Sequence, residues 1–157
     1  MQKITPFLWF NDNAEEAMDF YCSIFKNSKK GKITRYGANG PGPEGTVMSV
    51  RFQLEGQELY ALNGGPVFQF TPAISLFVDC KDQKEVDHYW EKLSEGGKKN
   101  NCGWVTDRFG MSWQVVPTVL GEMLADPDPV KAERVMQAML KMQRLIIKDL
   151  KDAYEKE

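Results

Sequence analysis

The chain has 157 residues, of which 42% are hydrophobic and 27% are charged, with 20 basic and 22 acidic side chains. These proportions fit one globular domain, or two small modules that share a core, and they exclude disordered and fibrous chains. The formal net charge is −2, and no Lys/Arg face is interleaved with aromatic residues, so nucleic acid is not an expected partner.

Two features of the sequence indicate the cellular compartment, namely the cysteines and the first six residues. Cys22, Cys80 and Cys102 are an odd number without close pairs, which is typical of reduced thiols in a cytoplasm. Residues 1–6 contain no apolar signal core, and no hydrophobic run approaches the roughly 20 residues of a membrane-spanning helix. We therefore expect a cytoplasmic protein without a membrane partner.

The first half of the chain predicts a strand, a helix and three further strands. Residues 4–10 are a short apolar run with Pro6, typical of an edge strand or of a strand that starts at its proline. Apolar residues recur at helical spacing over about 13–26, after the capping residues 11–13, and predict an amphipathic helix. A strand, a Gly- and Pro-rich loop and a two-stranded hairpin are expected next, over 33–37, 38–45, 47–54 and 57–63.

The second half repeats this order. Residues 73–78 predict a strand, and Asp79 to Asp82 offer capping groups for a helix. The apolar face of that helix holds Val86, Tyr89, Trp90 and Leu93, and Gly96-Gly97 ends it. A polar connector over 98–101 leads to the last hairpin.

The last hairpin, over residues 103–117, is the stretch where chemistry is expected. Its turn is predicted at 108–110, because Gly110 can adopt a positive φ and Asp107 can bond back to the backbone. In its second strand one face carries bulk and the other a possible polar contact, since Trp113, Val115 and Pro117 alternate with Ser112, Gln114 and Val116.

The tail after about residue 118 predicts helix. Asp128-Pro129 is typical of an N-cap followed by proline at the first helical position. Val135, Met139, Met142 and Ile146 form an apolar stripe that is expected to pack against the sheet or a partner subunit. One continuous helix and a helix with a break both fit. Because the stripe would be costly in water, we expect a homodimer.

These elements together predict the fold class. Each helix needs a surface that covers its apolar face, and a four-stranded sheet provides one. We therefore predict a single α+β domain over 1–157 built from two βαβββ modules and a C-terminal helical tail. The expected ranges are about 1–66 for module 1, about 67–118 for module 2 and about 119–157 for the tail.

Several segments resemble a known superfamily. The two modules resemble the vicinal oxygen chelate superfamily, with Ala17–Tyr21 in the first helix and Asp107–Gly110 before the last strand. This superfamily includes glyoxalase I, extradiol dioxygenases, fosfomycin-resistance enzymes and bleomycin-binding proteins. Five segments look like its PhnB-like subfamily, often labelled 3-demethylubiquinone-9 3-methyltransferase, namely 4–10, 61–66, 102–104, 113–117 and 124–129. The resemblance implies a curved mixed sheet of the glyoxalase/bleomycin resistance type. It also implies sites where modules of two chains meet, with modules paired within a chain or swapped.

The resemblance further implies where a metal ion would lie. The superfamily's catalysts hold an ion on the concave face of the sheet, with His or Glu from the first and last strands of each module. Counted from the helix starts and turn glycines, those positions here are Thr5 or Pro6, Tyr60, Ala73 and Gln114. None is a good transition-metal ligand, because a catalytic site needs about three imidazole or carboxylate donors. The single histidine, His88, falls in the second helix, so we expect no protein-held metal.

The methyltransferase label has no counterpart in the sequence. Binding of S-adenosylmethionine in the usual way calls for a strand, a Gly-rich turn and a helix. Residues 37–45 are rich in glycine, but Pro41, Pro43 and the strand that follows do not fit that plan. We therefore expect no cofactor, assign no catalytic residue, and favour a protein that is not an enzyme.

Seven residues are candidates for a ligand-binding cleft, namely Phe7, Trp9, Tyr60, Asn63, Trp104, Trp113 and Gln114. The aromatic ones can stack on a flat ligand, although aromatic residues at strand spacing belong more often to a hydrophobic core. The two amides either bond to a ligand or satisfy a neighbouring strand. The expected function is metal-independent binding of a small aromatic or amphiphilic ligand by a homodimer. The alternatives are a superfamily enzyme with a rebuilt site around Gln114 and Tyr60, and a structural or regulatory dimer.

Overall fold

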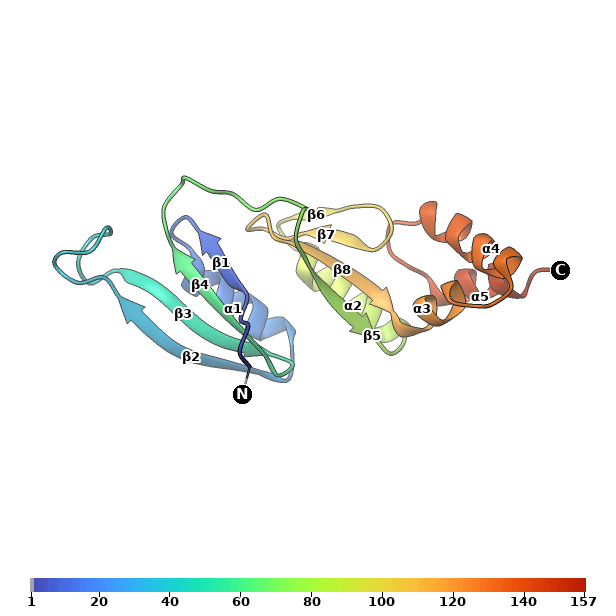
Figure 1. Ribbon diagram of the computed structural model, residues 1–157, viewed down its shortest axis with the longest axis horizontal. Helices are drawn as coiled ribbons and strands as arrows, with labels where there is room; N and C mark the ends of the chain where they lie inside the picture. Colours follow the sequence, from blue (N-terminus) through green and yellow to red (C-terminus); the bar gives the residue numbers. More distant parts are fainter. Residues whose placement is uncertain (1) are drawn as a thin grey trace. The chain divides into compact units, whose positions relative to one another are not determined.

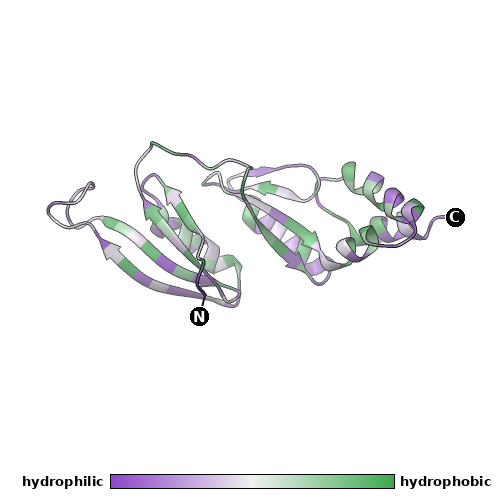
Figure 2. Cartoon of the chain, in the orientation of Figure 1, coloured by the Kyte–Doolittle hydropathy of each residue, from purple (hydrophilic) through white to green (hydrophobic). Residues whose placement is uncertain are grey.

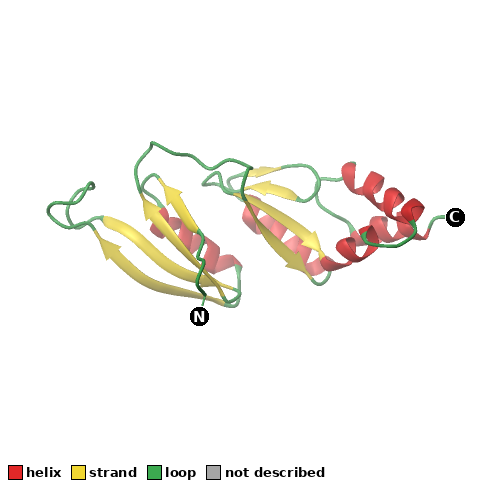
Figure 3. Ribbon diagram, in the orientation of Figure 1, coloured by secondary structure: helices red, strands yellow, loops and turns green. Residues whose placement is uncertain are grey.

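The computed structural model describes residues 2–157 and has the predicted α+β architecture of two βαβββ modules with a helical tail. The chain forms two compact units, one that ends at Phe70 and one over Thr71–Glu157. In each unit a helix covers one face of a four-stranded sheet (Figure 1, Figure 3). Figure 2 shows hydrophobic and hydrophilic residues alternating along the strands, as a sheet with one covered face requires.

The first unit is a mixed sheet with the strand order β1-β4-β3-β2. β1 (Phe7–Phe10) pairs in parallel with β4 (Gln57–Asn63), whereas β3 (Val47–Leu54) is antiparallel to both β4 and β2 (Ser28–Arg35). Helix α1 (Ala14–Ile24) packs on the face that carries the buried side chains of Leu8, Phe52 and Ala61. Because side chains alternate along a strand, Phe7, Trp9 and Tyr60 lie on the opposite, open face.

The start of α1 is capped differently from the prediction. Asn13 is the N-cap residue, but its side chain makes no capping bond. Instead, Asn63 Oδ1 at the end of β4 accepts from the Ala14 N–H at 2.8 Å, and its Nδ2 donates to the Val47 carbonyl at 3.1 Å. Asn63 therefore ties α1 to both β4 and β3.

The second unit repeats this topology, with the strand order β5-β8-β7-β6. β5 (Ser75–Cys80) pairs in parallel with β8 (Ser112–Pro117), and β7 (Trp104–Thr106) is antiparallel to both β8 and the short β6 (Lys98–Lys99). Asp82 caps helix α2 (Gln83–Ser94) as predicted, because its side chain accepts from the Glu85 N–H at 2.9 Å. The buried residues of α2 pack on β5, β7 and β8.

The predicted turn before β8 is confirmed. Gly110 has a φ of 90°, in the left-handed region that suits glycine. Asp107, 3% exposed, accepts from the N–H groups of Phe109 and Met111 at 2.9 and 3.0 Å, and from Trp113 Nε1 at 2.8 Å. One buried carboxylate therefore fixes the turn and the orientation of the indole that follows it.

The tail contains three helices, so the alternative of a break is the correct one. They are α3 (Thr118–Leu124), α4 (Pro129–Leu140) and α5 (Ile147–Glu155), and Asp128 caps α4 as predicted by accepting from the Val130 N–H at 2.9 Å. A buried cluster joins them, made of Val116, Leu120, Met123, Val135, Leu145 and Leu150. No helix among residues 2–157 is long and apolar enough to cross a membrane.

Candidate ligand-binding site

The open face of the first sheet carries a row of aromatic side chains. Phe7 and Tyr60 are register partners with ring centroids 5.6 Å apart, and Phe7 is 58% exposed. The Arg51 guanidinium lies 5.0 Å from the Tyr60 ring centroid and makes two hydrogen bonds to Glu58, at 2.9 and 2.6 Å. The bonds from Arg51 hold the pKa of the Glu58 carboxyl below its usual value. This row is a surface of fixed geometry with a cation at one end.

Trp9 lies on the same open face, two residues beyond Phe7. Its Nε1 donates to the Gly65 carbonyl at 3.0 Å, and its ring meets Phe68 edge to face at 4.9 Å. Gly64 is required beside it, because a Cβ there would lie 2.4 Å from the indole. The strap after β4 therefore holds Trp9 in place.

The second sheet has a corresponding row on its open face. Gln114 in β8 is the register partner of both Phe77 in β5 and Trp104 in β7. Phe77 is 58% exposed, the same fraction as Phe7. Phe77–Gln114–Trp104 thus occupies the place in the second module that Phe7–Tyr60–Arg51 occupies in the first.

A pocket of about 470 Å³ lies between the second row and the tail. Its lining comes from β5, β8, the residues around β7, and helices α3 and α4. The lining residues are Phe77, Asp79, Cys102, Trp104, Gln114, Val116, Pro117, Thr118, Leu120, Gly121, Leu124 and Met139. The repeated sheet supplies one wall of the pocket and the helical tail supplies the other.

Two consecutive backbone bonds hold the tail in place beside β7. The N–H groups of Cys102 and Gly103 donate to the carbonyls of Met142 and Gln143, both at 2.8 Å. Both donors have left-handed backbone, with φ of 59° and 82°, and this conformation is uncommon for a cysteine. The segment between α4 and α5 is therefore bonded directly to the edge of the pocket.

The pocket has few polar side chains, and they do not form the group of imidazoles and carboxylates that holds a metal ion. Gln114 Nε2 donates to Ser75 Oγ at 3.0 Å, and its Oε1 accepts no hydrogen bond from the described residues. Asp79 Oδ1 accepts from Thr118 Oγ1 at 2.8 Å. Asp79 is the single carboxylate of the lining, and no Lys, Arg or His of residues 2–157 lines the pocket.

The structure brings together some of the residues predicted for a cleft and separates others. Trp104 and Gln114 line this pocket, whereas Phe7, Trp9 and Tyr60 share the open face of the first sheet. Trp113 is corrected to a core residue, because it points to the opposite side of β8 from Gln114, is 2% exposed and donates to Asp107. Asn63 lies on the face of the sheet that α1 covers, and its side-chain amide is hydrogen-bonded to the backbone of α1 and β3.

Sequence reasoning missed most of the lining. Phe77 and Asp79 alternate along β5, and this period of two is the signal that could have assigned both to one face. Leu120, Leu124 and Met139 could not be assigned in the same way. They reach the pocket through packing of the tail, which leaves no local pattern in the sequence.

The donors at the positions implied for a metal do not fit one. No three His, Cys, Asp or Glu side chains among residues 2–157 form a group that could hold an ion. The Arg51 guanidinium over Tyr60 places positive charge beside the phenol, and Gln114 turns its NH₂ group toward Ser75. The Gly-rich residues 37–45 connect β2 to β3, so they also lack the helix that a cofactor-binding turn of the usual kind opens.

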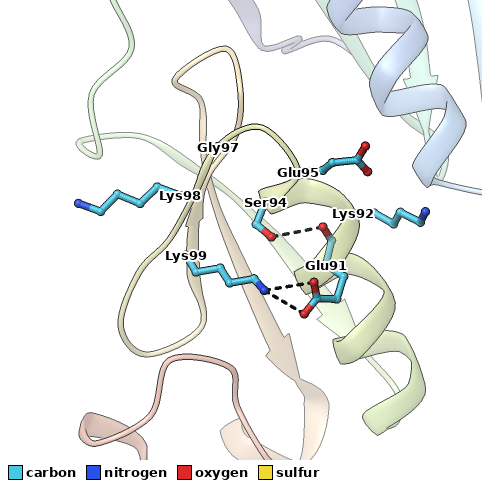
Figure 4. A pocket seen from close by; sticks show the side chains of 7 residues that line it. All are labelled: Glu91, Lys92, Ser94, Glu95, Gly97, Lys98 and Lys99. Carbon is cyan, nitrogen blue, oxygen red and sulfur yellow. Dashed lines mark hydrogen bonds and ion pairs between the residues drawn. The ribbon is translucent and has the colours of Figure 1, made fainter.

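A second hollow, of about 640 Å³, lies at the end of α2 and holds none of the predicted residues (Figure 4). Its charges compensate one another, since Lys99 Nζ bonds to both carboxylate oxygens of Glu91 at 3.0 and 3.1 Å. With basic and acidic groups mixed and few apolar side chains, it is a weaker candidate than the pocket beside the tail.

Comparisons with known proteins agree with the fold. A family model described as 3-demethylubiquinone-9 3-methyltransferase matches residues 2–116, a range that ends before the tail. A solved PhnB protein from Bacillus cereus is 42% identical with a TM-score of 0.68, and the match covers 74% of this chain and 99% of that chain. No curated protein matches the chain.

Two more distant solved structures show likeness of fold alone. A protein from Pseudomonas aeruginosa is 23% identical with a TM-score of 0.62, over 74% of this chain and 98% of that chain. The fosfomycin resistance protein FosX from Listeria monocytogenes, complexed with Mn(II) and sulfate ion, is 18% identical with a TM-score of 0.51, over 72% of this chain and 90% of that one. The family model and the Bacillus cereus structure show that the chain belongs to the PhnB-like family described as 3-demethylubiquinone-9 3-methyltransferase.

Proposed function

We propose that the protein binds a small aromatic or amphiphilic ligand in the pocket between the second sheet and the tail, without a metal ion held by its side chains. The observation that carries this proposal is the pocket itself. Its volume of about 470 Å³ falls within the usual range for small-molecule sites, about 300–1,000 Å³. Its apolar lining with a few polar groups is also the composition such sites share.

The lining favours binding over catalysis. It holds no imidazole that could act as a general base at neutral pH, and the single histidine lies in α2. Asp79 and Thr118 bond to each other, and Gln114 is neutral. An enzyme with a rebuilt site remains the alternative function, and it predicts turnover of a bound compound rather than binding alone.

The proposal is tested by a thermal-unfolding screen of aromatic and amphiphilic compounds against metal-stripped full-length protein. A ligand at about 100 times its Kd should add roughly 2.7 kcal/mol to the stability. Metal analysis of the protein as purified accompanies the screen. A stoichiometric, tightly held transition metal, or binding that disappears when the metal is stripped, contradicts the proposal.

Two variants locate the site. Phe77→Ala removes an aromatic ring from the pocket, and we expect it to abolish most of the shift caused by a ligand. Phe7→Ala removes an equally exposed ring from the corresponding position of the first module and should leave the shift unchanged. Equal losses in the two variants would place the ligand elsewhere.

A further inference from the structure

We infer that the pocket selects ligands that carry a positive charge, namely an amine or quaternary ammonium group on an aromatic or aliphatic body. This inference rests on the proposed function and narrows its ligand class. Its basis is the composition of the lining, in which Asp79 is the single acidic side chain and no Lys, Arg or His of residues 2–157 takes part. An anionic ligand would meet a carboxylate and no compensating base.

The neighbours of Asp79 strengthen this preference. Phe77 lies two residues before it in β5, on the same open face, and Trp104 lies in the same register row as Phe77. Aromatic faces attract ammonium groups through the negative potential of the ring, and Trp is the strongest of them. A carboxylate two residues from the exposed Phe77 ring, with the half-buried Trp104 in the same lining, is therefore a combination that suits a cation.

The hydrogen bonds in the pocket leave one side-chain amide oxygen available to accept from a ligand. Thr118 directs its hydroxyl hydrogen to Asp79, and Gln114 directs its NH₂ group to Ser75. The Gln114 carbonyl oxygen is left without a partner among the described residues. A ligand N–H group can donate to this oxygen, whereas a phosphonate or carboxylate oxygen finds no side-chain NH group of a basic residue in the lining.

The tail provides the contacts for the ligand body. Leu120 and Leu124 of α3 and Met139 of α4 face the pocket opposite the sheet. These side chains offer apolar surface without further charge, so they favour a ligand whose charge is confined to one end. The geometry thus points to a cationic amphiphile rather than a polyamine or an anion.

A matched series of probes tests the inference. The probes are 4-phenylbutyl-trimethylammonium, 4-phenylbutanol and 5-phenylpentanoate, which share a phenylalkyl body and differ in the charge of the head group. Each is titrated into ¹⁵N-labelled full-length protein, and the indole Nε1–H signal of Trp104 is followed after its assignment with Trp104→Phe. We expect affinity to fall from the cation to the alcohol to the anion.

Asp79→Asn removes the charge while retaining an oxygen that can accept from Thr118. This substitution should lower the affinity for the cation about two- to fivefold, the range typical of an exposed ion pair. The affinity for the alcohol should stay unchanged. Glu122→Gln removes an exposed charge of α3 outside the lining, and it should change neither the affinity for the cation nor that for the alcohol. The preference should shrink as salt rises, because the carboxylate is exposed to solvent.

The outcomes separate the two proposals. If the alcohol binds at Trp104 but the cation binds no better than the anion, or if Asp79→Asn changes nothing, the charge selection is wrong and the binding site stands. If no probe moves the Trp104 signal and none of the screened compounds stabilises the protein, the proposed function itself is wrong.

Discussion

Gly97 sits where the backbone of the second module leaves no room for a side chain. A Cβ at this position would lie 2.2 Å from the Thr106 carbonyl oxygen and 2.7 Å from the Asp107 carbonyl carbon, neither of which can move without disturbing the hairpin. Gly97→Ala should therefore lower the free energy of unfolding by about 1–3 kcal/mol, as overpacking does. Urea unfolding of the full chain measures this loss.

Gly121 is the matched control for Gly97. It lies within α3, and a Cβ there would meet nothing within 4 Å. Gly121→Ala should raise the stability by about 0.5–1 kcal/mol, because alanine loses less backbone entropy in a helix. Equal effects of the two substitutions would show that the close approach at Gly97 does not constrain the fold.

Cys80 should be chemically inert in the native protein. It is fully buried on β5, and burial raises the pKa of its thiol to about 12. Since the thiolate is the reactive form, alkylation by iodoacetamide at pH 8 should modify the half-buried Cys22 and Cys102 well before Cys80. Peptide mass spectrometry follows the order of modification, and all three thiols should react alike in urea.

Individual residues differ in how far the sequence predicts them. The alternation in β8 predicts that Trp113 and Gln114 face opposite sides of the sheet. It does not predict which side meets α2, because a half-buried strand with an aromatic residue on one face fits either orientation. The buried bond from Trp113 to Asp107 decides this point, and the bond exists only once the turn has formed.

At the scale of helices and strands, the sequence predicts a helix cap when the capping residue lies next to the helix. It does not predict a cap that comes from a distant part of the chain. The caps at Asp82 and Asp128 lie next to the helices they start, so a short window of sequence contains the whole motif. The cap of α1 comes from Asn63, which is brought there by the pairing of β1 with β4. No window around residues 11–13 contains that information.

The packing of the tail helices carries a prediction of its own. Leu145 is fully buried in the tail cluster, and its side chain lies against Gly103 at the edge of the pocket. Leu145→Ala should cost about 2–5 kcal/mol, the range for a buried leucine. Leu140→Ala on α4 should cost well under half of that, because Leu140 is 52% exposed. Urea unfolding compares the two, and similar losses would contradict this account of the cluster.

At the scale of the whole molecule, stability should fall in acid. Hydrogen bonds from Arg51 and Tyr154 lower the pKa of Glu58 and Asp126 respectively. A depressed pKa in the folded state adds stability above the unfolded value of about 4, and this contribution is lost as pH falls through the folded value. Glu58→Gln should therefore reduce the difference in urea midpoint between pH 7 and pH 3. An unchanged difference would remove Glu58 from this effect.

Formation of a homodimer stays a proposal, and the apolar stripe of the tail does not support it. The apolar stripe of the tail is covered within the chain, since Val135 is fully buried and Met139 and Met142 pack on the tail cluster. Five large apolar residues of the first unit stay exposed and would be covered in a dimer, namely Ile4, Phe7, Ile33, Val67 and Phe68. We expect sedimentation equilibrium to give about twice the chain mass of 17.9 kDa, and a single-chain mass would refute the dimer.

The two bonds from Cys102 and Gly103 to the carbonyls of Met142 and Gln143 join the repeated fold to a segment that the family match does not include. A segment of this kind can change a binding surface without any change in the strands beneath it, because Leu120, Leu124 and Met139 form the wall of the pocket opposite the sheet. Members of the family that end near the last strand would then share a common description with this chain and yet recognise different molecules. On the proposed binding site, proteins that share the βαβββ scaffold would differ in ligand according to the segment that follows it.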